Sequence, residues 1–428
     1  MTLCLSGSAW LAFAEGDPER AARLEGAAEG LRRRVGQRAW PHLRRVEADL
    51  VAQVRQQLAA GRFDQVFSVG GRLTQREAVA IVQNETANVV KIATSHVTDG
   101  RGCLVSGLGV NSGVRRVMVV RVFVAGGSGA LGRRLVPQLV ARGHQVTATA
   151  TGRAKLGLLE QLGADGVVMD GLDAVSVGRA VAAARPDAIV HQMTALSAAH
   201  AGKPDLKHPD RFFATTIRLR SEGTDHLLAA AEAIGASHLV AQGFGAFNGI
   251  REGGWVKSEE DPMDPGPASA RQGVEALGHL EDVVVKAGGA VLRYGSFYGP
   301  GAIDDWVGLV RKRQFPLVGG GTGYLSWVHL DDAASATVLA LEQQATGVFN
   351  IADDEPAPAS EWLPYLAACA GAKRPVRVPK WVARLLAGEL AVLMMTEGRG
   401  FSNAKAKREL GWKPHYPSWR QGFKEELA

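Results

Sequence analysis

Short apolar runs rich in β-branched residues alternate with helical patterns over most of the chain from Val119 onwards. The runs VVRVFVAG, QVTATA, DGVVMD and DAIVHQM are separated by GALGRRLVPQLVARG, LGLLEQLG and AVSVGRAVAAA, in which apolar residues recur at helical spacing. Three more strands are expected at ASHLVAQG, GAVLRYGSF and GVFNIAD. This alternation predicts an α/β fold of the Rossmann type, a doubly wound parallel sheet with helices on both faces, over residues 118–428. The less regular part, residues 300–428, predicts a small C-terminal substrate subdomain that is partly interleaved with the sheet.

Residues 1–90 show a different pattern, with Ala, Leu and Arg at helical spacing and almost no strand signal. Within GSAWLAFAEGDPERAARLEGAAEGLRRR, Asp17 is expected to cap a helix whose first residue is Pro18. Residues 91–117 contain several Gly and Ser without a sustained period, which predicts a linker. Met118 opens the next pattern so cleanly that we consider the first segment a fusion or the product of a misassigned gene start. Mass spectrometry of the native protein tests this, because a single species that begins at Met118 would remove the first segment from the protein.

Composition narrows the class of protein. The 428 residues are 46% hydrophobic and 21% charged, with a formal net charge of +6, which is typical of a folded soluble protein. No apolar run approaches the roughly 18 residues that cross a bilayer, and no Lys or Arg precedes the apolar run at the N-terminus, so we expect a cytoplasmic protein without a signal peptide. Cys4, Cys103 and Cys369 are widely spaced and the histidines do not cluster with acids, so no metal site is expected. The basic excess lies mainly in residues 1–117 without a finger motif or an aromatic and basic pattern, which disfavours nucleic-acid binding.

The turn after the first strand carries candidate cofactor chemistry. In VFVAGGSGALGRRLV, three glycines have the spacing G-x-x-G-x-x-G between a buried-type strand and an amphipathic helix, which is the context that dinucleotide binding requires. Glycines let the main chain approach a pyrophosphate, and the helix N-terminus presents N–H groups to it. We therefore expect a dinucleotide to bind the loop formed by Gly126, Ser128, Gly129, Ala130, Leu131 and Gly132. The alternative is a tight strand–helix turn without a ligand.

The end of the second strand favours NADP as the cofactor. NAD-binding folds usually place an acid there to hold the ribose 2′-hydroxyl, but HQVTATATGRAK contains none. Thr151, Arg153 and Lys155 instead offer hydroxyl and cationic groups suited to a 2′-phosphate. The alternatives are NAD as the cofactor, or Arg153 and Lys155 as ordinary solvated residues. Asp170, at the end of the third strand, is expected near the adenine.

Seven ordered motifs resemble a known family. GGSGALG, DAIVHQMTAL, SEGTDHLLAAA, VLRYGSFYGPG, WVHLDDAASA, GVFNIADDEP and SNAKAKRELGW follow one another as in the NAD-dependent epimerase/dehydratase branch of the short-chain dehydrogenase/reductase superfamily. The resemblance implies that Met193 and Thr194 line the cofactor ribose and nicotinamide, and that the segment beginning at Arg293 lies beside the substrate. It also implies that WVHLDD ties the substrate subdomain to the core, although we prefer Asp332 as the N-cap of a helix that starts at Ala333. A small carbonyl or sugar-like substrate and a homodimer built from paired helices are further implications of the family.

The chain departs from this family at the catalytic positions. In the family a Tyr-x-x-x-Lys pair lies on the helix before the Arg293 strand, with its Lys four residues before a Glu that matches Glu281. The stretch SARQGVEALGHLEDVVV then has Gly273 at the Tyr position and Leu277 at the Lys position, and the catalytic Ser falls on Gly243. In the family these groups hold the substrate oxygen and transfer its proton. General acid–base help of this kind is worth about 10²–10⁴ in rate.

Four side chains are candidates to replace the missing proton donor: Tyr298, Tyr294, His279 and Lys257, each with packing or solvent exposure as its ordinary role. We favour an atypical NADP-dependent oxidoreductase or epimerase-like protein, because the chain retains a shaped substrate side. The alternative is a non-catalytic NADP-binding redox sensor, so enzymatic activity itself stays an open question. The N-terminal helices resemble the C-terminal end of tetratricopeptide-like arrays in large ATP-dependent transcriptional regulators, which suggests a protein partner for them.

Overall fold

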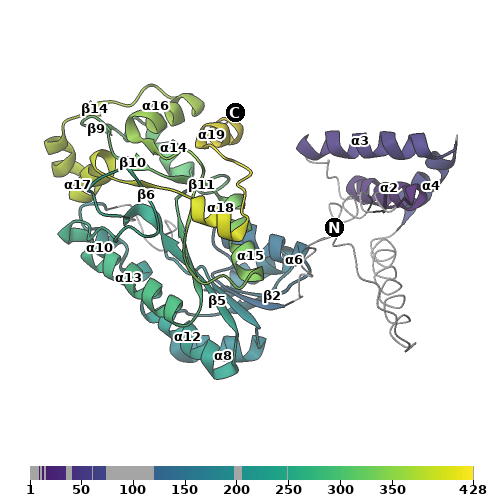
Figure 1. Cartoon of the computed structure of the whole chain (residues 1–428), viewed down its shortest axis with the longest axis horizontal. Coiled ribbons are helices and arrows are strands. Elements are labelled where there is room, and N and C mark those ends of the chain that lie inside the picture. Colours follow the sequence, from purple (N-terminus) through teal and green to yellow (C-terminus); the bar gives the residue numbers. More distant parts are fainter. Residues whose placement is uncertain are drawn as a thin grey trace, which may run out of the picture. The chain divides into compact units, whose positions relative to one another are not determined.

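The computed structural model describes residues 9, 12–13, 16–34, 41–59, 61–73, 120–196, 205–247 and 249–427. The chain divides into two compact units, Met1–Val114 and Arg115–Ala428, and each is described by itself (Figure 1). The predicted linker 91–117 and Met118 lie outside the described residues.

The described part of the first unit is helical. It comprises α2 (Pro18–Arg34), α3 (Pro41–Gln57) and α4 (Arg62–Arg72). The predicted cap is confirmed, because Asp17 Oδ1 accepts a hydrogen bond from the Arg20 N–H at 2.9 Å and Pro18 is the first residue of α2. Helices α2 and α4 are in close contact: a Cβ atom on Gly70 would lie 2.0 Å from the Arg23 carbonyl oxygen. Only a residue without a side chain permits this approach.

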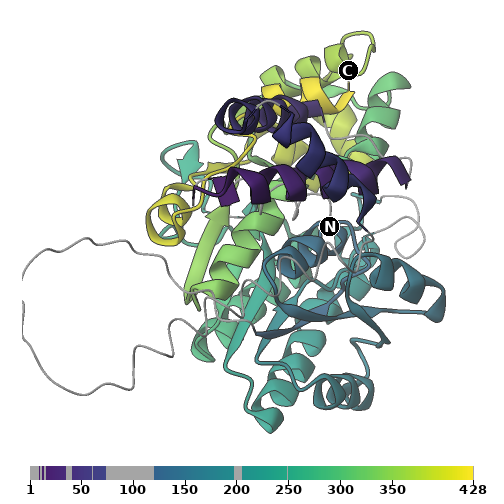
Figure 2. The ribbon, with the colours of Figure 1, turned by 90° about the vertical axis from the view of Figure 1, so that its right-hand side faces the viewer.

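The second unit is built on a sheet of seven parallel strands (Figures 1 and 2). The strands lie in the order β12-β7-β5-β4-β1-β2-β3. Their bounds are β1 Arg121–Ala125, β2 Gln145–Ala150, β3 Asp165–Val168, β4 Ala188–His191, β5 His238–Phe244, β7 Ala290–Tyr294 and β12 Gly347–Ile351. The strand order reverses between β1 and β4, and ligands of open α/β sheets bind at such a switch point. The predicted doubly wound, Rossmann-type fold is confirmed.

Helices cover both faces of the sheet (Figure 1). On one face α6 (Gly132–Ala141) packs against α15 (Leu330–Glu342), and on the other lie α8 (Ala174–Ala184), α12 (Glu222–Ile234) and α13 (Arg271–Lys286). Residues of β1 alternate between the two cores, with Val122 and Val124 in the first and Phe123 and Ala125 in the second. Shorter connecting elements are η1 Arg153–Lys155, α7 Leu156–Gln161, α10 Pro209–Phe212, α11 Ala214–Arg220, η2 Gly245–Phe247 and η3 Ala268–Ala270.

A buried ion pair fixes α13 against the sheet. The Arg293 guanidinium on β7 donates two hydrogen bonds to the Glu281 carboxylate on α13, at 2.6 and 2.7 Å, and both side chains are almost fully buried. Two parallel bonds between planar groups set position as well as distance. Because residues four apart lie on one helix face, Leu277 and Gly273 continue the row that begins at Glu281.

The small subdomain is assembled from segments that are far apart in sequence. Its elements are β6 Val256–Lys257, β8 Ser296–Tyr298, α14 Asp304–Arg311, β9 Leu317–Val318, β10 Tyr324–Leu325, β11 Trp327–His329, β13 Ala357–Pro358, α16 Ala359–Cys369, β14 Arg377–Val378, α17 Lys380–Thr396, β15 Gly400–Phe401, α18 Ala404–Leu410 and α19 Trp419–Leu427. The short strands pair as β8 with β11, β9 with β14, β10 with β13, and β6 with β15. Aromatic rings in edge-to-face contact fill its core, including Tyr298, Trp327, Trp362 and Phe423.

The role we preferred for Asp332 is wrong. Helix α15 begins at Leu330, and its N-cap is His329, whose ring accepts the Asp331 N–H. Asp332 lies inside the first turn, and its buried carboxylate accepts the N–H groups of His415 and Tyr416 at 2.6 and 2.9 Å. The aspartate therefore joins the C-terminal segment to the sheet domain, as the family resemblance implied.

Replacing Asp332 should destabilise this unit, because Asp332→Ala leaves two main-chain N–H groups without their acceptor. Each unsatisfied buried group costs about 1–3 kcal/mol, so we expect the free energy of unfolding to fall by about 2 kcal/mol or more in urea titrations. The control is Asp331→Ala, which removes a half-exposed carboxylate one residue away and should cost less than about 1 kcal/mol. Equal losses in the two variants would contradict the structural role of Asp332.

Candidate dinucleotide and substrate site

The glycine turn is held rigidly at the switch point. Gly126 follows β1 with φ 94°, and a Cβ atom there would lie 2.6 Å from the Gln192 carbonyl oxygen, so only glycine fits. Its N–H donates to Thr149 Oγ1 on β2 at 2.9 Å. Gly132, the first residue of α6, is equally confined, since its Cβ would lie 2.5 Å from the Gly127 carbonyl oxygen. The turn is thus fixed to β2 and to the segment that follows β4.

The middle of the turn is open and has free donors. A Cβ atom on Gly129 would meet a single atom within 4 Å, the Gly126 carbonyl oxygen at 3.2 Å. Within the part of the chain that the structure describes, the N–H groups of Ala130 and Leu131 have no acceptor. Ser128 is half-buried, and its N–H points back to the Thr149 carbonyl oxygen at 3.4 Å. Unpaired donors at the start of a helix fit a diphosphate, so the six predicted loop residues suit the group that the sequence predicts.

The predicted 2′-phosphate residues surround the end of β2. Thr151, Arg153 and Lys155 are all exposed there, with the last two in η1. Among the described residues, neither cation has a carboxylate within 4.0 Å. Asp170 lies beyond the end of β3, exposed, with its Oδ1 accepting the Leu172 N–H at 2.9 Å. The two positive charges are therefore free to bind an anion.

The two residues predicted to lie beside the nicotinamide behave differently. Met193 is buried in the core between the sheet and helices α8, α12 and α13, where its sulfur lies against Gly171. Its N–H donates to His191 Nδ1 at 3.2 Å. Thr194 is half-buried at the sheet edge. Met193 thus has a packing role in addition to any contact that its main chain makes with a ligand.

The three positions predicted to have lost catalytic groups lie on one face, between β5 and α13. A Cβ atom on Gly243 would be 3.0 Å from Val291 Cγ1, so the strand is tightly packed there. Gly273 has more room, with its nearest possible Cβ contact 3.7 Å away at Asp210 Oδ1. Leu277 is buried in an apolar cluster with Phe247 and its neighbours. None of the side chains at 243, 273 and 277 can ionise.

The carboxylate of Asp210, a residue of α10, lies at the start of α13. The sequence pattern did not predict this contact. The carboxylate accepts the N–H groups of Gln272 and Gly273 at 3.2 and 3.1 Å, while Ala270 supplies no side-chain cap. A carboxylate at a helix N-terminus is stabilised by the unpaired donors and the helix dipole. Asp210 comes from a different helix, α10, so no local motif could have predicted this contact.

The two candidate tyrosines are buried in different hydrophobic cores, Tyr294 beside the sheet and Tyr298 in the small subdomain. The Tyr294 hydroxyl lies 2.6 Å from Thr337 Oγ1 on α15, and burial raises the pKa of Tyr294 well above its usual range. Tyr298 is enclosed by the aromatic core of the small subdomain, with its ring against Gly422, and burial followed by the nearby Asp353 carboxylate raises its pKa further. Both phenols therefore stay protonated and are poor proton donors.

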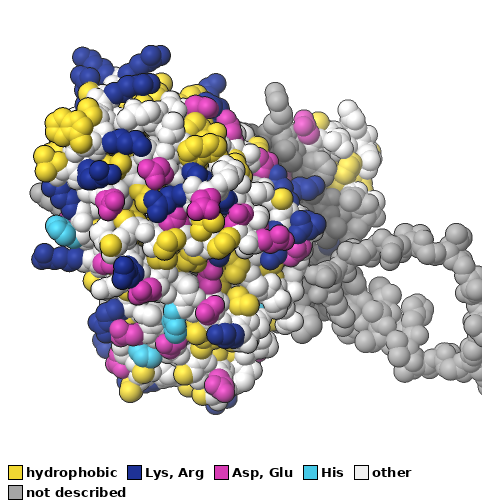
Figure 3. All heavy atoms as spheres, turned by 60° about the vertical axis from the view of Figure 1, so that its left-hand side comes forward, with side chains coloured by type: hydrophobic (Ala, Val, Ile, Leu, Met, Phe, Trp, Pro, Cys, Tyr) yellow, Lys and Arg dark blue, Asp and Glu magenta, His cyan; other side chains and the backbone are white. Residues whose placement is uncertain are grey.

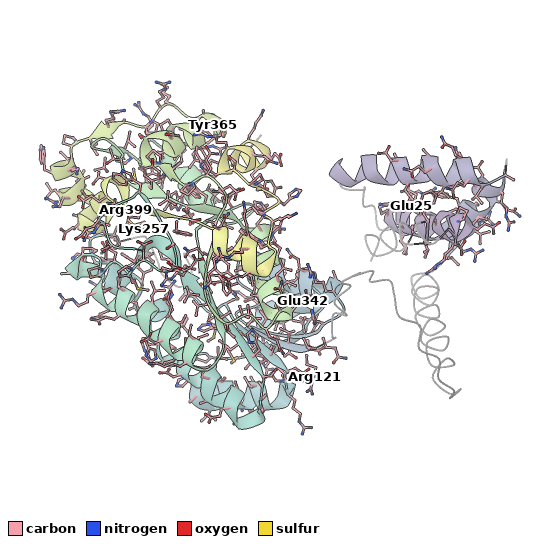
Figure 4. The ribbon with its side chains drawn as sticks, in the orientation of Figure 1. Glu25, Arg121, Lys257, Glu342, Tyr365 and Arg399 are labelled. Atoms are coloured by element: carbon pink, nitrogen blue, oxygen red, sulfur yellow. The ribbon has the colours of Figure 1, made fainter. Side chains whose placement is uncertain are left out.

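The other two candidates make local polar contacts. His279 Nε2 is 2.8 Å from Asp225 Oδ1, and both side chains are substantially exposed. Lys257 is buried near Arg399 (Figure 4), where its Nζ donates to the Glu252 carbonyl oxygen at 2.6 Å and lies 3.4 Å from Asp261 Oδ1. The structure does not bring these four side chains together.

A small pocket lies between the sheet edge and the subdomain. Phe244 and Tyr294, which are paired across β5 and β7, form one wall, and Tyr324, Met394 and Phe401 contribute to the other. Most lining side chains are apolar, and the volume of about 10 Å³ gives room for roughly one water molecule.

Arg220, the last residue of α11, was not predicted from the sequence. It is buried beside the sheet edge that lines the pocket, and its Cζ lies 6.0 Å from the Phe244 ring centroid. The only signal was its spacing, because Arg220 follows the buried Thr216 by one helical turn and so falls on the inward face.

Together the parallel sheet and the glycine turn define a dinucleotide-binding α/β protein. The model of the "NAD dependent epimerase/dehydratase family" matches residues 122–352, and the chain belongs to this family. The expected nicotinamide dinucleotide cofactor is confirmed at the level of the family.

Known relatives include reductases. The chain is 42% identical over 318 residues to a 3-diazoavenalumate denitrifying reductase from a Streptomyces species, covering 72% of this chain and 100% of that protein. It is 30% identical over 278 residues to a 2-alkyl-3-oxoalkanoate reductase from Stenotrophomonas maltophilia, covering 60% and 77%. Among solved structures, a human epimerase family protein with NADPH aligns with a TM-score of 0.54 at 20% identity, covering 72% of this chain and 99% of that one. The relatives support an oxidoreductase-like role on small molecules.

Among the described residues, no group of three or more His, Cys, Asp or Glu side chains could hold a metal ion. No described helix combines the length and apolar character that a membrane span needs. On the face shown in Figure 3, cationic and acidic side chains are interspersed.

The open position in the glycine turn gives a direct test of dinucleotide binding. Gly129→Ala adds one methyl group where the main chain is expected to meet the diphosphate, with a single protein neighbour. We expect the NADPH dissociation constant, measured by calorimetry, to rise at least about tenfold, while the melting temperature changes little. Gly178→Ala on α8, where a Cβ meets nothing within 4 Å, is the control and should leave binding unchanged. Unaltered affinity in Gly129→Ala would remove the turn from the site.

Proposed function

We propose that this protein is an NADPH-dependent reductase that replaces a diazonium group on a small organic acid by hydrogen and releases dinitrogen. The observation that carries the proposal is the face between β5 and α13, where Gly243, Gly273 and Leu277 offer no group that can transfer a proton. The 42% identity to a denitrifying reductase, over the whole length of that protein, supports the same assignment.

The proposed reaction explains why this face needs no acid. When NADPH is bound, it supplies a hydride. In carbonyl reduction the oxygen must also receive a proton, and help with that proton is worth about 10²–10⁴ in rate. In the proposed step a carbon–hydrogen bond forms with the two hydride electrons, and the carbon–nitrogen bond breaks with its electron pair leaving on dinitrogen. A diazonium cation and a hydride thus give the hydrocarbon and dinitrogen, with atoms and charge balanced and no proton required.

The residues of this chain would act by binding and by excluding water. The glycine turn holds the diphosphate, and Arg153 and Lys155 hold the 2′-phosphate. The buried cluster of Leu277 and Phe247, with the partly buried Phe244 packed against it, makes this region apolar, which would limit competing attack by water on a reactive diazonium carbon. Positioning of this kind accounts for a large share of catalysis in many enzymes.

Carbonyl reduction is the second candidate, because the chain is also similar to a 2-alkyl-3-oxoalkanoate reductase. It would require a proton donor, and Tyr294 is the sequence-predicted candidate of the two phenols, Tyr294 and Tyr324, that line the pocket. Its bond to Thr337 and its raised pKa argue against that role. The non-catalytic sensor remains the third reading, and a homodimer and a protein partner for the N-terminal helices stay predictions.

A matched substrate pair separates these functions. With NADPH deuterated at the transferable position, the full chain should convert 4-carboxybenzenediazonium into benzoate that carries deuterium at the vacated carbon, with release of dinitrogen detected by mass spectrometry. 4-Formylbenzoate, which carries an aldehyde at the same place, should not be reduced above the rate without protein. Reduction of the aldehyde alone would establish carbonyl chemistry, and NADPH binding without either reaction would establish a sensor.

The cofactor preference has its own test. Arg153→Ala removes a cation that we expect to contact the 2′-phosphate, and a hydrogen bond to a charged group is worth about 1.5–3 kcal/mol. The NADPH dissociation constant should therefore rise at least about tenfold, while that of NADH stays the same. Arg179→Ala on α8, an exposed arginine away from β2, controls for the change in net charge. An equal effect on NADPH and NADH would show that Arg153 does not read the 2′-phosphate.

A further inference from the structure

Among the residues that the structure describes, the buried cation Arg220 has no counter-ion. The residue is 9% exposed, and its Nε is shielded from solvent without a hydrogen-bond partner. Within the described ranges, no carboxylate lies within 4.0 Å of its guanidinium and no acceptor takes a hydrogen bond from it. The buried Arg293 is different, because it is held by both oxygens of Glu281.

The charge of Arg220 is retained at neutral pH. Burial lowers the pKa of the guanidinium to about 10, which still leaves it protonated under physiological conditions. An uncompensated buried charge is costly, and proteins normally pair such groups or expose them. The fold therefore maintains an unfavourable charge that none of the described side chains neutralises.

The neighbours of Arg220 supply no negative charge. His191 is buried at the end of β4, and burial, with the nearby Arg220 charge as a smaller contribution, lowers the pKa of its imidazole to about 4, so it is neutral. The Thr216 hydroxyl accepts the Ala195 N–H, and the Thr224 hydroxyl donates to the Arg220 carbonyl oxygen. The Phe244 ring lies 6.0 Å from the guanidinium carbon, which provides a weak cation–π contact at most.

The place of Arg220 in the fold is the substrate half of the site. It ends α11, which packs against α13, and it lies near the carboxyl ends of β4 and β5. The expected phosphate-binding residues lie on the other side of the switch point, after β1 and β2. Phe244, beside the guanidinium, also lines the pocket and packs against the apolar cluster that contains Leu277.

We propose that Arg220 is the anion-binding residue of the substrate site, and that it takes a carboxylate of the substrate as its missing counter-ion. The guanidinium has a planar fork of donors that matches a carboxylate bidentately. The proposal rests on the proposed function and adds a selection rule, namely that organic acids bind and their neutral esters do not. Arg220 acts as a specificity and positioning residue, since its contact is with the carboxylate rather than with the reacting carbon.

Binding of simple probes to the NADP-loaded full chain tests this assignment. Calorimetry should show that the wild-type protein binds benzoate at least about tenfold more tightly than methyl benzoate. Arg220→Met should abolish that preference by weakening benzoate alone, and Arg220→Lys, which keeps the charge but loses the fork, should retain part of it. The matched control is Arg218→Met on the same helix, an exposed arginine paired with Glu222, which should keep the full preference.

Stability gives a readout that a structural arginine would not produce. Without ligand, Arg220→Met removes an unpaired buried charge and should raise the melting temperature by a few degrees, whereas an arginine retained for packing would lower it on removal. Benzoate should then stabilise the wild type and not the variant.

Three results would overturn the proposal: no preference for benzoate in the wild type, the same preference in Arg220→Met, or a loss of NADP affinity in Arg220→Met with benzoate binding intact. The last result would assign the guanidinium to a cofactor phosphate. Failure of the proposed function is distinguishable, because it would appear as absent dinitrogen release while the preference of Arg220 for benzoate persists.

Discussion

The main chain at Gly126 lies so close to the Gln192 carbonyl oxygen that no side chain fits between them. This contact joins the end of β1 to the exit of β4, and the bond from Gly126 to Thr149 adds β2 to the same rigid edge. The dinucleotide loop, the end of β2 and the substrate face beyond β4 therefore keep fixed positions relative to one another. Without that edge, neither the free donors of the loop nor the cations after β2 would be directed at a common ligand.

The sheet was predictable from the sequence because parallel strands buried on both faces are continuous apolar runs, and each such run contains a strand. The glycine turn was also predictable, since strand, turn and helix are neighbours in the chain. Contacts between distant segments were not. Asp332 binds main-chain groups more than 80 residues away, and its acidic position near a helix start suggested a local cap instead.

The substrate side was less accessible to sequence reasoning for the same physical reason. A pattern shows that Arg220 falls on the inward face of a short helix, but only the packing of α11 against α13 shows that no acid of the described segments meets it. The vacated positions were visible as Gly243, Gly273 and Leu277, yet the tight contact of Gly243 with Val291 was not. A serine at this position would require the Val291 side chain to shift by a few tenths of an ångström, so the proposed chemistry, which needs no serine, suits the packing of β5 as it stands.

The pairing of β6 with β15 has a consequence for synthesis of the protein. Val256 and Lys257 find their strand partners at Gly400 and Phe401, so roughly 140 residues must leave the ribosome before this short ladder closes. Contacts between such distant segments form late, because loop-closure entropy is lost before they contribute stability. The sheet can begin to assemble during translation. The β6–β15 ladder is completed only after Phe401 has been synthesised, and until then the nascent chain would expose apolar surface to chaperones.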